Sequence, residues 1–106
     1  MRVITGRRLQ AHWEQRGRAD SEGPLRAWYA EAKKAGWRTS ADIKAKFASA
    51  SFIADNRVVF NIGGNKYRLV VHVNYEIGVV LVKFVGTHAE YDAIDPVTIG
   101  GGGAPR

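Results

Sequence analysis

Cysteine is absent from this 106-residue chain, which excludes disulfide bonds, thiolate metal ligands and a thiol nucleophile. No apolar run is long enough for a signal peptide or a membrane-spanning helix, so we expect a soluble, cytoplasmic protein without membrane contact. The three histidines, His12, His72 and His88, lack the spacing of metal ligands. We therefore expect no metal and no small-molecule cofactor.

Acidic residues are scarce relative to basic ones. The chain has 10 Asp and Glu against 16 Lys and Arg, a net charge of +6. This excess favours a polyanionic partner: nucleic acid, an acidic protein segment or an anionic membrane surface. Hydrophobic residues make up 45% and charged residues 25%, as in one globular domain. We expect that domain to span residues 1–96, followed by a flexible glycine-rich tail over residues 97–106.

The first half of the chain has a helical pattern. We expect a short edge strand at residues 2–5, a weak helix over 6–18, a clear helix from Pro24 to Gly36, and a short helix capped by Thr39 or Ser40. Trp13, Trp28 and Trp37 are interpreted as packing residues. The arginines of the first helix (Arg7, Arg8, Arg16 and Arg18) form a basic face, which is either solvated or follows a phosphate backbone.

The second half alternates polar and apolar residues, as strands do. Gly63-Gly64 predicts a two-residue hairpin that pairs Ile62 with Asn65. Cross-strand partners share a face, so the apolar side chains pack against the helices. The opposite face then receives the polar residues Asn61, Lys66 and Arg68.

A second hairpin at residues 74–78 leads into a nearly continuous apolar strand that carries Lys83, so we place this strand inside the sheet. Thr87 is the expected N-cap of a helical turn in which His88 and Tyr91, three residues apart, share a side. Together these elements predict an α+β fold, with N-terminal helices packed on a small, mostly antiparallel sheet.

The polar face has residue types suited to a phosphodiester. The guanidinium of Arg68 matches phosphate geometry, and the place of His88 just past a buried strand suits a histidine acting as an acid or base. Each residue has a simpler interpretation: Arg68 pairs with Glu76 or Glu90, Lys66 is a solvated hairpin residue, His88 lies on the surface, and Tyr91 packs. Asn61 equally suits a role in satisfying the turn backbone.

The segments FNIGGNKYRL and FVGTHAEYD closely resemble HigB-type toxins of bacterial type II toxin–antitoxin systems, within the RelE-like mRNA interferase superfamily. The resemblance covers roughly residues 1–96. It implies a RelE-like α+β fold and a ribosome-dependent endoribonuclease. Such a toxin cuts mRNA in the ribosomal A site, contacts 16S rRNA, inhibits translation and is neutralised by a cognate antitoxin.

The resemblance also assigns roles to residues. Arg68 stands at the position of a phosphate-binding arginine, and His88 stands where many relatives carry a catalytic arginine. The expected catalytic set is Arg68, His88, Lys66 and Tyr91; the expected RNA contacts are Asn61, Lys83 and Arg57. Two alternatives stay open: a toxin of related fold that inhibits DNA gyrase without cutting RNA, and a non-catalytic basic RNA-binding domain.

Overall fold

The computed structural model describes residues 1–101 and has the expected α+β fold. Five strands form one sheet in the order β1-β5-β4-β3-β2. Four strands are antiparallel to their neighbours, whereas β1 runs parallel to β5. The strand predicted inside the sheet, β5, does lie between β1 and β4.

The chain order of the elements is β1 (Arg2–Ile4), α1 (Arg8–Trp13), the 3-10 turn η1 (Ala19–Ser21), α2 (Glu22–Lys34), α3 (Ser40–Lys46), β2 (Ser51–Ile53), β3 (Arg57–Ile62), β4 (Tyr67–Asn74), β5 (Val79–Thr87) and α4 (His88–Asp92). The first helix is shorter than the expected 6–18, because the chain leaves the helix after Trp13 and turns at Gly17, where φ is +80°. Thr39 and Thr87 are the N-caps of α3 and α4, as predicted.

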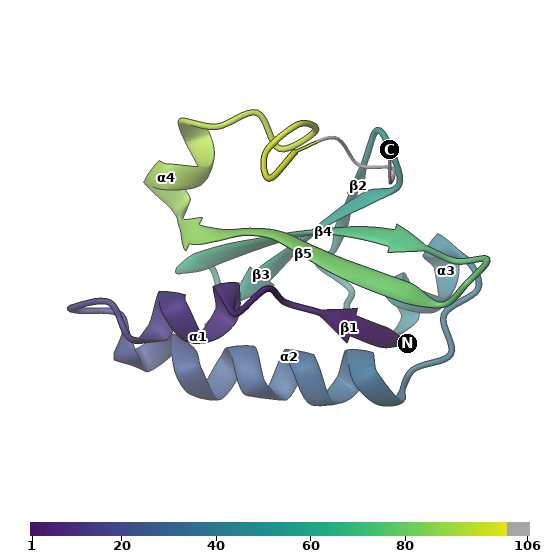
Figure 1. Ribbon diagram of the computed structural model, residues 1–106, viewed down its shortest axis with the longest axis horizontal. Coiled ribbons are helices and arrows are strands. Elements are labelled where there is room, and N and C mark those ends of the chain that lie inside the picture. The colour runs from purple at the N-terminus through teal and green to yellow at the C-terminus, as the bar shows by residue number, and fades with distance from the viewer. Residues whose placement is uncertain (102–106) are drawn as a thin grey trace.

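The sheet separates two layers (Figure 1). Helices α1 and α2 cover one face, which we call the inner face, and α4 with the chain that follows it lies over the other, the outer face. The inner face carries the apolar side chains of β3 and β4, including Phe60, Tyr67 and Leu69. The outer face carries Arg57, Val59 and Asn61 of β3 and Arg68, Val70 and His72 of β4.

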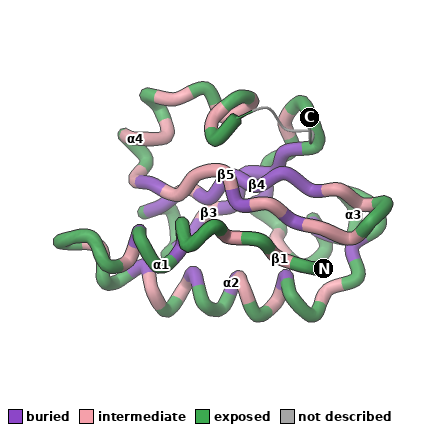
Figure 2. Tube along the Cα trace, in the orientation of Figure 1, coloured by how far each residue is buried: buried purple, intermediate pink, exposed green. Residues whose placement is uncertain are grey.

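The core lies between α2 and the inner face, where the buried positions of the sheet are concentrated (Figure 2). Phe60 is at its centre, with Trp28 5.5 Å and Phe47 5.0 Å away in edge-to-face contacts and Trp37 stacked at 6.4 Å. These geometries are the favoured ones for aromatic pairs. The packing interpretation of Trp28 and Trp37 is therefore confirmed, and half-buried Trp13 packs against the same core.

The hairpin between β3 and β4 differs from the two-residue turn predicted for it. Ile62 pairs with Tyr67, so the turn contains four residues, Gly63 to Lys66. Both glycines have positive φ, +63° and +70°, which glycine adopts without steric cost. The register shift is two residues, and only an odd shift would exchange the faces. Asn61 and Arg68 consequently remain on one face, directly opposite each other.

The chain beyond residue 96 contacts the sheet as far as the structure describes it. Backbone N–H groups of Thr98 and Ile99 donate to the Asp95 carbonyl, and the carbonyls of Ile99 and Gly101 accept from Arg57. Residues 97–101, the first part of the expected tail, are thus held against the sheet by the buried Arg57 side chain. The rest of that tail, residues 102–106, lies outside the described residues. In residues 1–101, no helix is long and apolar enough to cross a membrane.

Candidate phosphate-binding site

Arg68 is the centre of a small polar cluster on the outer face, which we call the Arg68 site: Arg68, Asn61, Asn65 and Tyr91. The Arg68 guanidinium donates to the side-chain oxygen of Asn61 and lies 3.4 Å from that of Asn65. The Tyr91 ring lies beneath it, with 5.9 Å between the guanidinium carbon and the ring centroid. These neighbours orient the guanidinium without neutralising it.

No carboxylate within residues 1–101 forms an ion pair with Arg68. The simpler interpretation, in which Arg68 pairs with Glu76 or Glu90, is therefore wrong. Glu90 pairs with Arg18 instead. A half-exposed arginine held by two amide oxygens and a ring face keeps its full charge and free N–H groups for an anionic ligand.

The helix α4 brings Tyr91 to Arg68, and a reciprocal cap fixes the start of this helix. The Thr87 hydroxyl accepts from the Glu90 N–H at 3.2 Å, and the Glu90 carboxylate accepts from the Thr87 N–H at 2.8 Å. Gly86 allows this arrangement, since a Cβ there would lie 2.8 Å from the Glu90 carboxylate and 2.5 Å from the Phe84 ring. Tyr67 opposes Thr87 across the strands, so α4 starts beside the Arg68 strand.

A long-range ion pair also holds α4. The Arg18 guanidinium makes two hydrogen bonds to the Glu90 carboxylate, at 2.8 and 2.9 Å, across 72 residues of sequence. Bidentate pairs of this kind fix orientation as well as distance. Hydrogen bonding to Arg18, followed by that to the Thr87 backbone, lowers the pKa of Glu90. The carboxylate that caps α4 is thus fixed by the segment joining α1 to α2.

His88 is the first residue of α4 and is exposed. Its Nδ1 lies 3.4 Å from the Asp92 carboxylate, one turn along the helix. The structure places His88 next to an acid, and the Tyr91 ring faces Arg68. Both residues belong to the helix that starts beside the Arg68 strand, and this is the region where the sequence placed them.

Lys66 does not join Arg68. Lys66 is the fourth residue of the longer hairpin turn. Its ammonium lies 2.5 Å from the Asp20 carboxylate in η1, on the inner side of the sheet. Asp20 also accepts from the Tyr67 hydroxyl at 2.6 Å. Hydrogen bonds to Lys66 and then to Tyr67 lower the pKa of Asp20, and Asp20 in turn raises the pKa of Lys66. The placement of Lys66 beside Asn61 and Arg68 is corrected, because a two-residue turn had been assumed.

Arg57 lies at the other end of the outer face and is fully buried. Its guanidinium donates to the carbonyls of Pro96 at 2.9 Å, Ile99 at 2.7 Å and Gly101 at 2.6 Å. Burial lowers the pKa of Arg57. With no exposed surface, Arg57 cannot contact RNA in this conformation, contrary to the expectation from sequence.

Lys83 lies at the same end of the outer face as Arg57, the end that the C-terminal segment covers. It is the extra residue where the β4–β5 register shifts between Val70 and Val71, and its ammonium lies 3.5 Å from the Gly100 carbonyl. Burial, followed by repulsion from Arg57 and Arg8, lowers its pKa. Lys83, expected from the sequence to contact RNA, therefore contacts the C-terminal segment instead of joining the Arg68 site.

Sequence reasoning missed three contributors to this region. The sequence predicts Asn65 as a strand residue, Asp92 as part of a loop or a helical turn, and Arg18 as one arginine of the basic face of the first helix. The His88–Asp92 spacing of four residues was a usable signal once a helical turn was assumed. The Arg18–Glu90 pair left no such signal in the sequence, because it joins residues 72 positions apart.

The Arg68 site can bind an oxyanion. Its donors are the guanidinium N–H groups that no carboxylate of residues 1–101 binds, and its aromatic wall is Tyr91. His88 is the first residue of the helix that carries Tyr91. Within residues 1–101, no group of three His, Asp or Glu side chains is placed to hold a metal ion. A phosphate bound here would be held by hydrogen bonds from Arg68.

Comparison with known families agrees with this geometry. A family model for HigB toxins, described as the RelE-like toxic component of a toxin–antitoxin system, matches residues 21–94. The match includes the hairpin with Asn61 and Arg68 and the helix with His88 and Tyr91. No curated protein matches the chain. Because the matched residues make up most of its length, the chain belongs to the HigB family of RelE-like toxins.

Proposed function

We propose that this toxin is a metal-independent endoribonuclease that cuts mRNA in the ribosomal A site of the cytoplasm and so inhibits translation. The observation that carries the proposal is the Arg68 guanidinium, oriented by Asn61 and the Tyr91 ring and not paired with any carboxylate of residues 1–101. A guanidinium in this state is suited to binding the charged oxygens of a phosphodiester. The family supplies the toxin role.

The proposed chemistry uses the RNA itself as nucleophile. The 2′-hydroxyl loses its proton to a base and attacks the neighbouring phosphorus. The bond from phosphorus to the 5′ oxygen breaks, and an acid protonates that oxygen. The products are a 2′,3′-cyclic phosphate and a 5′-hydroxyl, with no water consumed.

Arg68 would bind the non-bridging oxygens, where negative charge grows in the transition state. One such donor contributes on the order of 10²- to 10³-fold in rate. His88 would transfer one of the two protons, a role typically worth about 10²- to 10⁴-fold. Asp92, 3.4 Å from Nδ1, would orient the imidazole. Tyr91 would stack on the nucleotide or transfer the second proton.

The proposal explains why the ribosome would be required. Arg68 and His88 lie on the outer face, and the His88 side chain is 53% exposed. Correct alignment of a 2′-hydroxyl with its phosphate can itself contribute several orders of magnitude. Here the mRNA, fixed in the A site and contacted with help from 16S rRNA, would provide that alignment. Free RNA would be cut slowly.

The test is brief induction in bacteria with the 5′ ends of mRNA mapped, for wild type, Arg68→Ala, His88→Ala and the control Arg38→Ala. Arg38 is exposed and remote from α4. The proposal expects growth arrest with new cuts inside translated frames for wild type and Arg38→Ala, and neither for the other two. Arrest with intact mRNA would contradict it and favour gyrase or another protein target. RNA binding without cleavage would leave a non-catalytic RNA-binding domain.

A further inference from the structure

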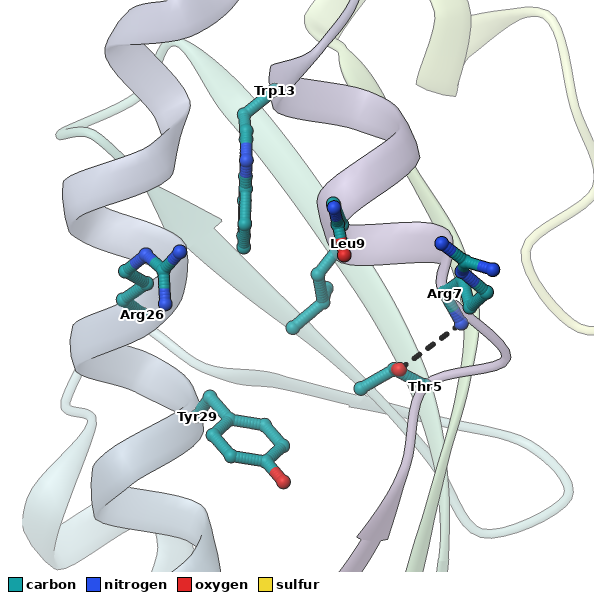
Figure 3. A pocket seen from close by; sticks show the side chains of 7 residues that line it. Thr5, Arg7, Leu9, Trp13, Arg26 and Tyr29 are labelled. Carbon is teal, nitrogen blue, oxygen red and sulfur yellow. Dashed lines mark hydrogen bonds between the residues drawn. The ribbon is translucent and has the colours of Figure 1, made fainter.

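His12 is a buried histidine that the proposed chemistry does not use. It lies on α1 and is 1% exposed, while Leu9 and Trp13 of the same helix point toward α2 (Figure 3). The Nδ1 of His12 lies 2.9 Å from the Ser21 hydroxyl. Its ring meets the Tyr67 ring edge-on, with 4.9 Å between the centroids. From α1, His12 therefore contacts two other elements, η1 and β4.

The hydrogen bonds of Ser21 decide which nitrogen of His12 carries the proton. The Ser21 hydroxyl donates its one hydrogen to the Arg18 carbonyl at 2.8 Å, so toward His12 its oxygen can only accept. In the neutral ring, Nδ1 is therefore protonated and Nε2 has a free lone pair. This Nε2 is buried and has no hydrogen-bond partner within residues 1–101. A proton on Nε2 would create a buried charge whose N–H has no acceptor, which is costly.

Ser21 belongs to a short segment, residues 18–21, that we call the η1 segment. The Arg18 carbonyl accepts from the Ser21 hydroxyl and, at 3.1 Å, from the Ser21 backbone N–H. The Arg18 guanidinium binds the Glu90 carboxylate, which caps the helix that carries Tyr91. Ser21 thus fixes the backbone of Arg18, and the side chain of Arg18 fixes α4.

The η1 segment also holds the strand of Arg68. Asp20 accepts from the Tyr67 hydroxyl at 2.6 Å and binds the Lys66 ammonium. Tyr67 directly precedes Arg68 on β4, and His12 packs against the Tyr67 ring. The η1 segment and His12 therefore connect the two elements that form the Arg68 site, β4 and α4.

We propose that His12 is a positioning residue for RNA cleavage: it holds the η1 segment through Ser21, this segment orients α4 beside Arg68, and acid releases the hold. The inference rests on the proposed ribonuclease function. His12 acts through Ser21 and Arg18 and does not touch the RNA, since it is buried on the inner side of the sheet.

The surroundings of His12 set the direction of the pH effect. Burial first, and then repulsion from Arg18, lowers the pKa of His12. The carboxylates of Glu90 and Asp20 oppose this shift. The contacts of the neutral ring are therefore complete at pH 7 and weaken as the pH falls below about 6.5, because a ring that has left Ser21 binds a proton more readily.

The elements packed against α1 contribute the following titratable and charged groups on this side: Arg18 and Asp20 of the η1 segment, Tyr67 of β4, Glu90 of α4, and Arg26 of α2, which lies over Trp13 and pairs with Glu22. From β5, the side chains in this core are valines. His12 is the group of this set whose ordinary pKa lies nearest to the range between pH 5 and pH 7.

Three variants separate the hydrogen bond from the titration. His12→Phe keeps an aromatic ring but cannot bind Ser21, and Ser21→Ala removes the hydroxyl. His12→Asn places an amide N–H near the position of Nδ1 and has no proton to gain in this pH range. The matched control is His72→Phe, which changes the other buried histidine of residues 1–101, on the outer face beside Arg57. Circular dichroism confirms that each variant is folded.

The first readout contains no RNA. NMR follows the backbone amides of Thr87 and Glu90, the two donors of the α4 cap, with Arg18→Gln as the reference for a cap without its ion pair. At pH 7 we expect both amides to shift toward this reference in His12→Phe and Ser21→Ala, but not in His12→Asn or the control. Between pH 7 and pH 5 they should shift further in wild type than in His12→Asn.

The second readout is the single-turnover rate of mRNA cleavage on ribosomes at pH 7. We expect the rate to fall about five-fold in His12→Phe and Ser21→Ala, with ribosome affinity within about two-fold, and to stay within about two-fold of wild type in His12→Asn. Unshifted amides or an unchanged rate in His12→Phe would overturn the proposal, as would an equal acid shift in His12→Asn and wild type. A wild-type protein that cuts no mRNA would contradict the ribonuclease function, whereas the amide shifts decide separately whether His12 orients α4.

Discussion

Arg57 and Arg68 lie on the same face of neighbouring strands, yet their surroundings differ. Arg57 is fully buried, and three backbone carbonyls from residues 96–101 accept its hydrogen bonds. Arg68, at the opposite end of the face, is half-exposed and held by Asn61 and Tyr91. The C-terminal chain accounts for the difference: α4 borders Arg68, and the segment beyond α4 covers Arg57.

The comparison shows that a basic residue on a polar face can stabilise the fold or bind a ligand, depending on a segment far away in sequence. It separates a structural end of the outer face from a functional one. Four predictions test that separation, beginning with the largest expected effect.

The largest effect is expected for Arg68→Ala. Loss of one donor to a charged transition state should lower the cleavage rate on ribosomes carrying mRNA at least about 100-fold. Stability should change by less than about 0.5 kcal/mol, since Arg68 is only half-buried and forms no ion pair within residues 1–101. Single-turnover rates and thermal unfolding measure both quantities. A variant that cuts at the wild-type rate would remove Arg68 from the site.

The reverse pattern is expected for Arg57→Met. Three part-buried carbonyls would lose their donor, and we expect a loss of about 2 kcal/mol of unfolding free energy, or roughly 8–16 °C in Tm for a domain of this size. Arg38→Met, at an exposed position, is the control and should change little. If Arg57→Met unfolded at the wild-type temperature but failed to bind ribosomes, Arg57 would be a functional residue after all.

A smaller effect is expected for Arg18→Gln, which removes the bidentate pair with Glu90. The Arg18 and Glu90 side chains are 22% and 44% exposed, so stability should fall by less than about 1 kcal/mol. The orientation of α4 should suffer more, and we expect the single-turnover rate to fall roughly ten-fold with ribosome affinity within two-fold. An unchanged rate would show that the Thr87–Glu90 cap alone is enough to orient α4.

The smallest effect is expected in the pH dependence of stability, and it concerns His72, at the end of the outer face that the C-terminal segment covers. Burial first, and then repulsion from Arg57 and Lys83, lowers the pKa of His72 below its usual 6.5, although Asp55 opposes the shift. The unfolded chain therefore binds the proton more readily, and stability falls as the pH drops below about 6.5. Chemical denaturation at pH 7 and pH 5 should show a smaller acid-induced loss in His72→Val than in wild type. An equal acid-induced loss in the two proteins would show that another group causes it, for example buried His12.

Local patterns predicted much of this fold. The period of the apolar residues located α2, and glycines with threonine caps located the turns and the start of α4. The alternation of β3 and β4 put Asn61 and Arg68 on one face, and that result survived a wrong turn length because the error was two residues.

The errors share a physical cause, which is dependence on distant parts of the chain. Lys66 lies on the inner side of the sheet because its ammonium binds the carboxylate of Asp20, which is 46 residues away in the sequence. Arg57 is buried by a glycine-rich segment whose composition resembles a loose tail, and the sequence contains no sign that its carbonyls accept from a guanidinium 39 to 44 residues away. The Arg68–Tyr91 contact could be anticipated, because a strand end and a following capped turn constrain it locally.

The most direct test of the account is the fate of mRNA on purified ribosomes exposed to the toxin. We predict cleavage in the A site with a 2′,3′-cyclic phosphate on the upstream fragment. A single 2′-deoxynucleotide on the 5′ side of the scissile phosphate should abolish the cut, since the attacking oxygen is then absent. Translation that stops while the mRNA stays intact, or cleavage that persists at the deoxy position, would contradict it.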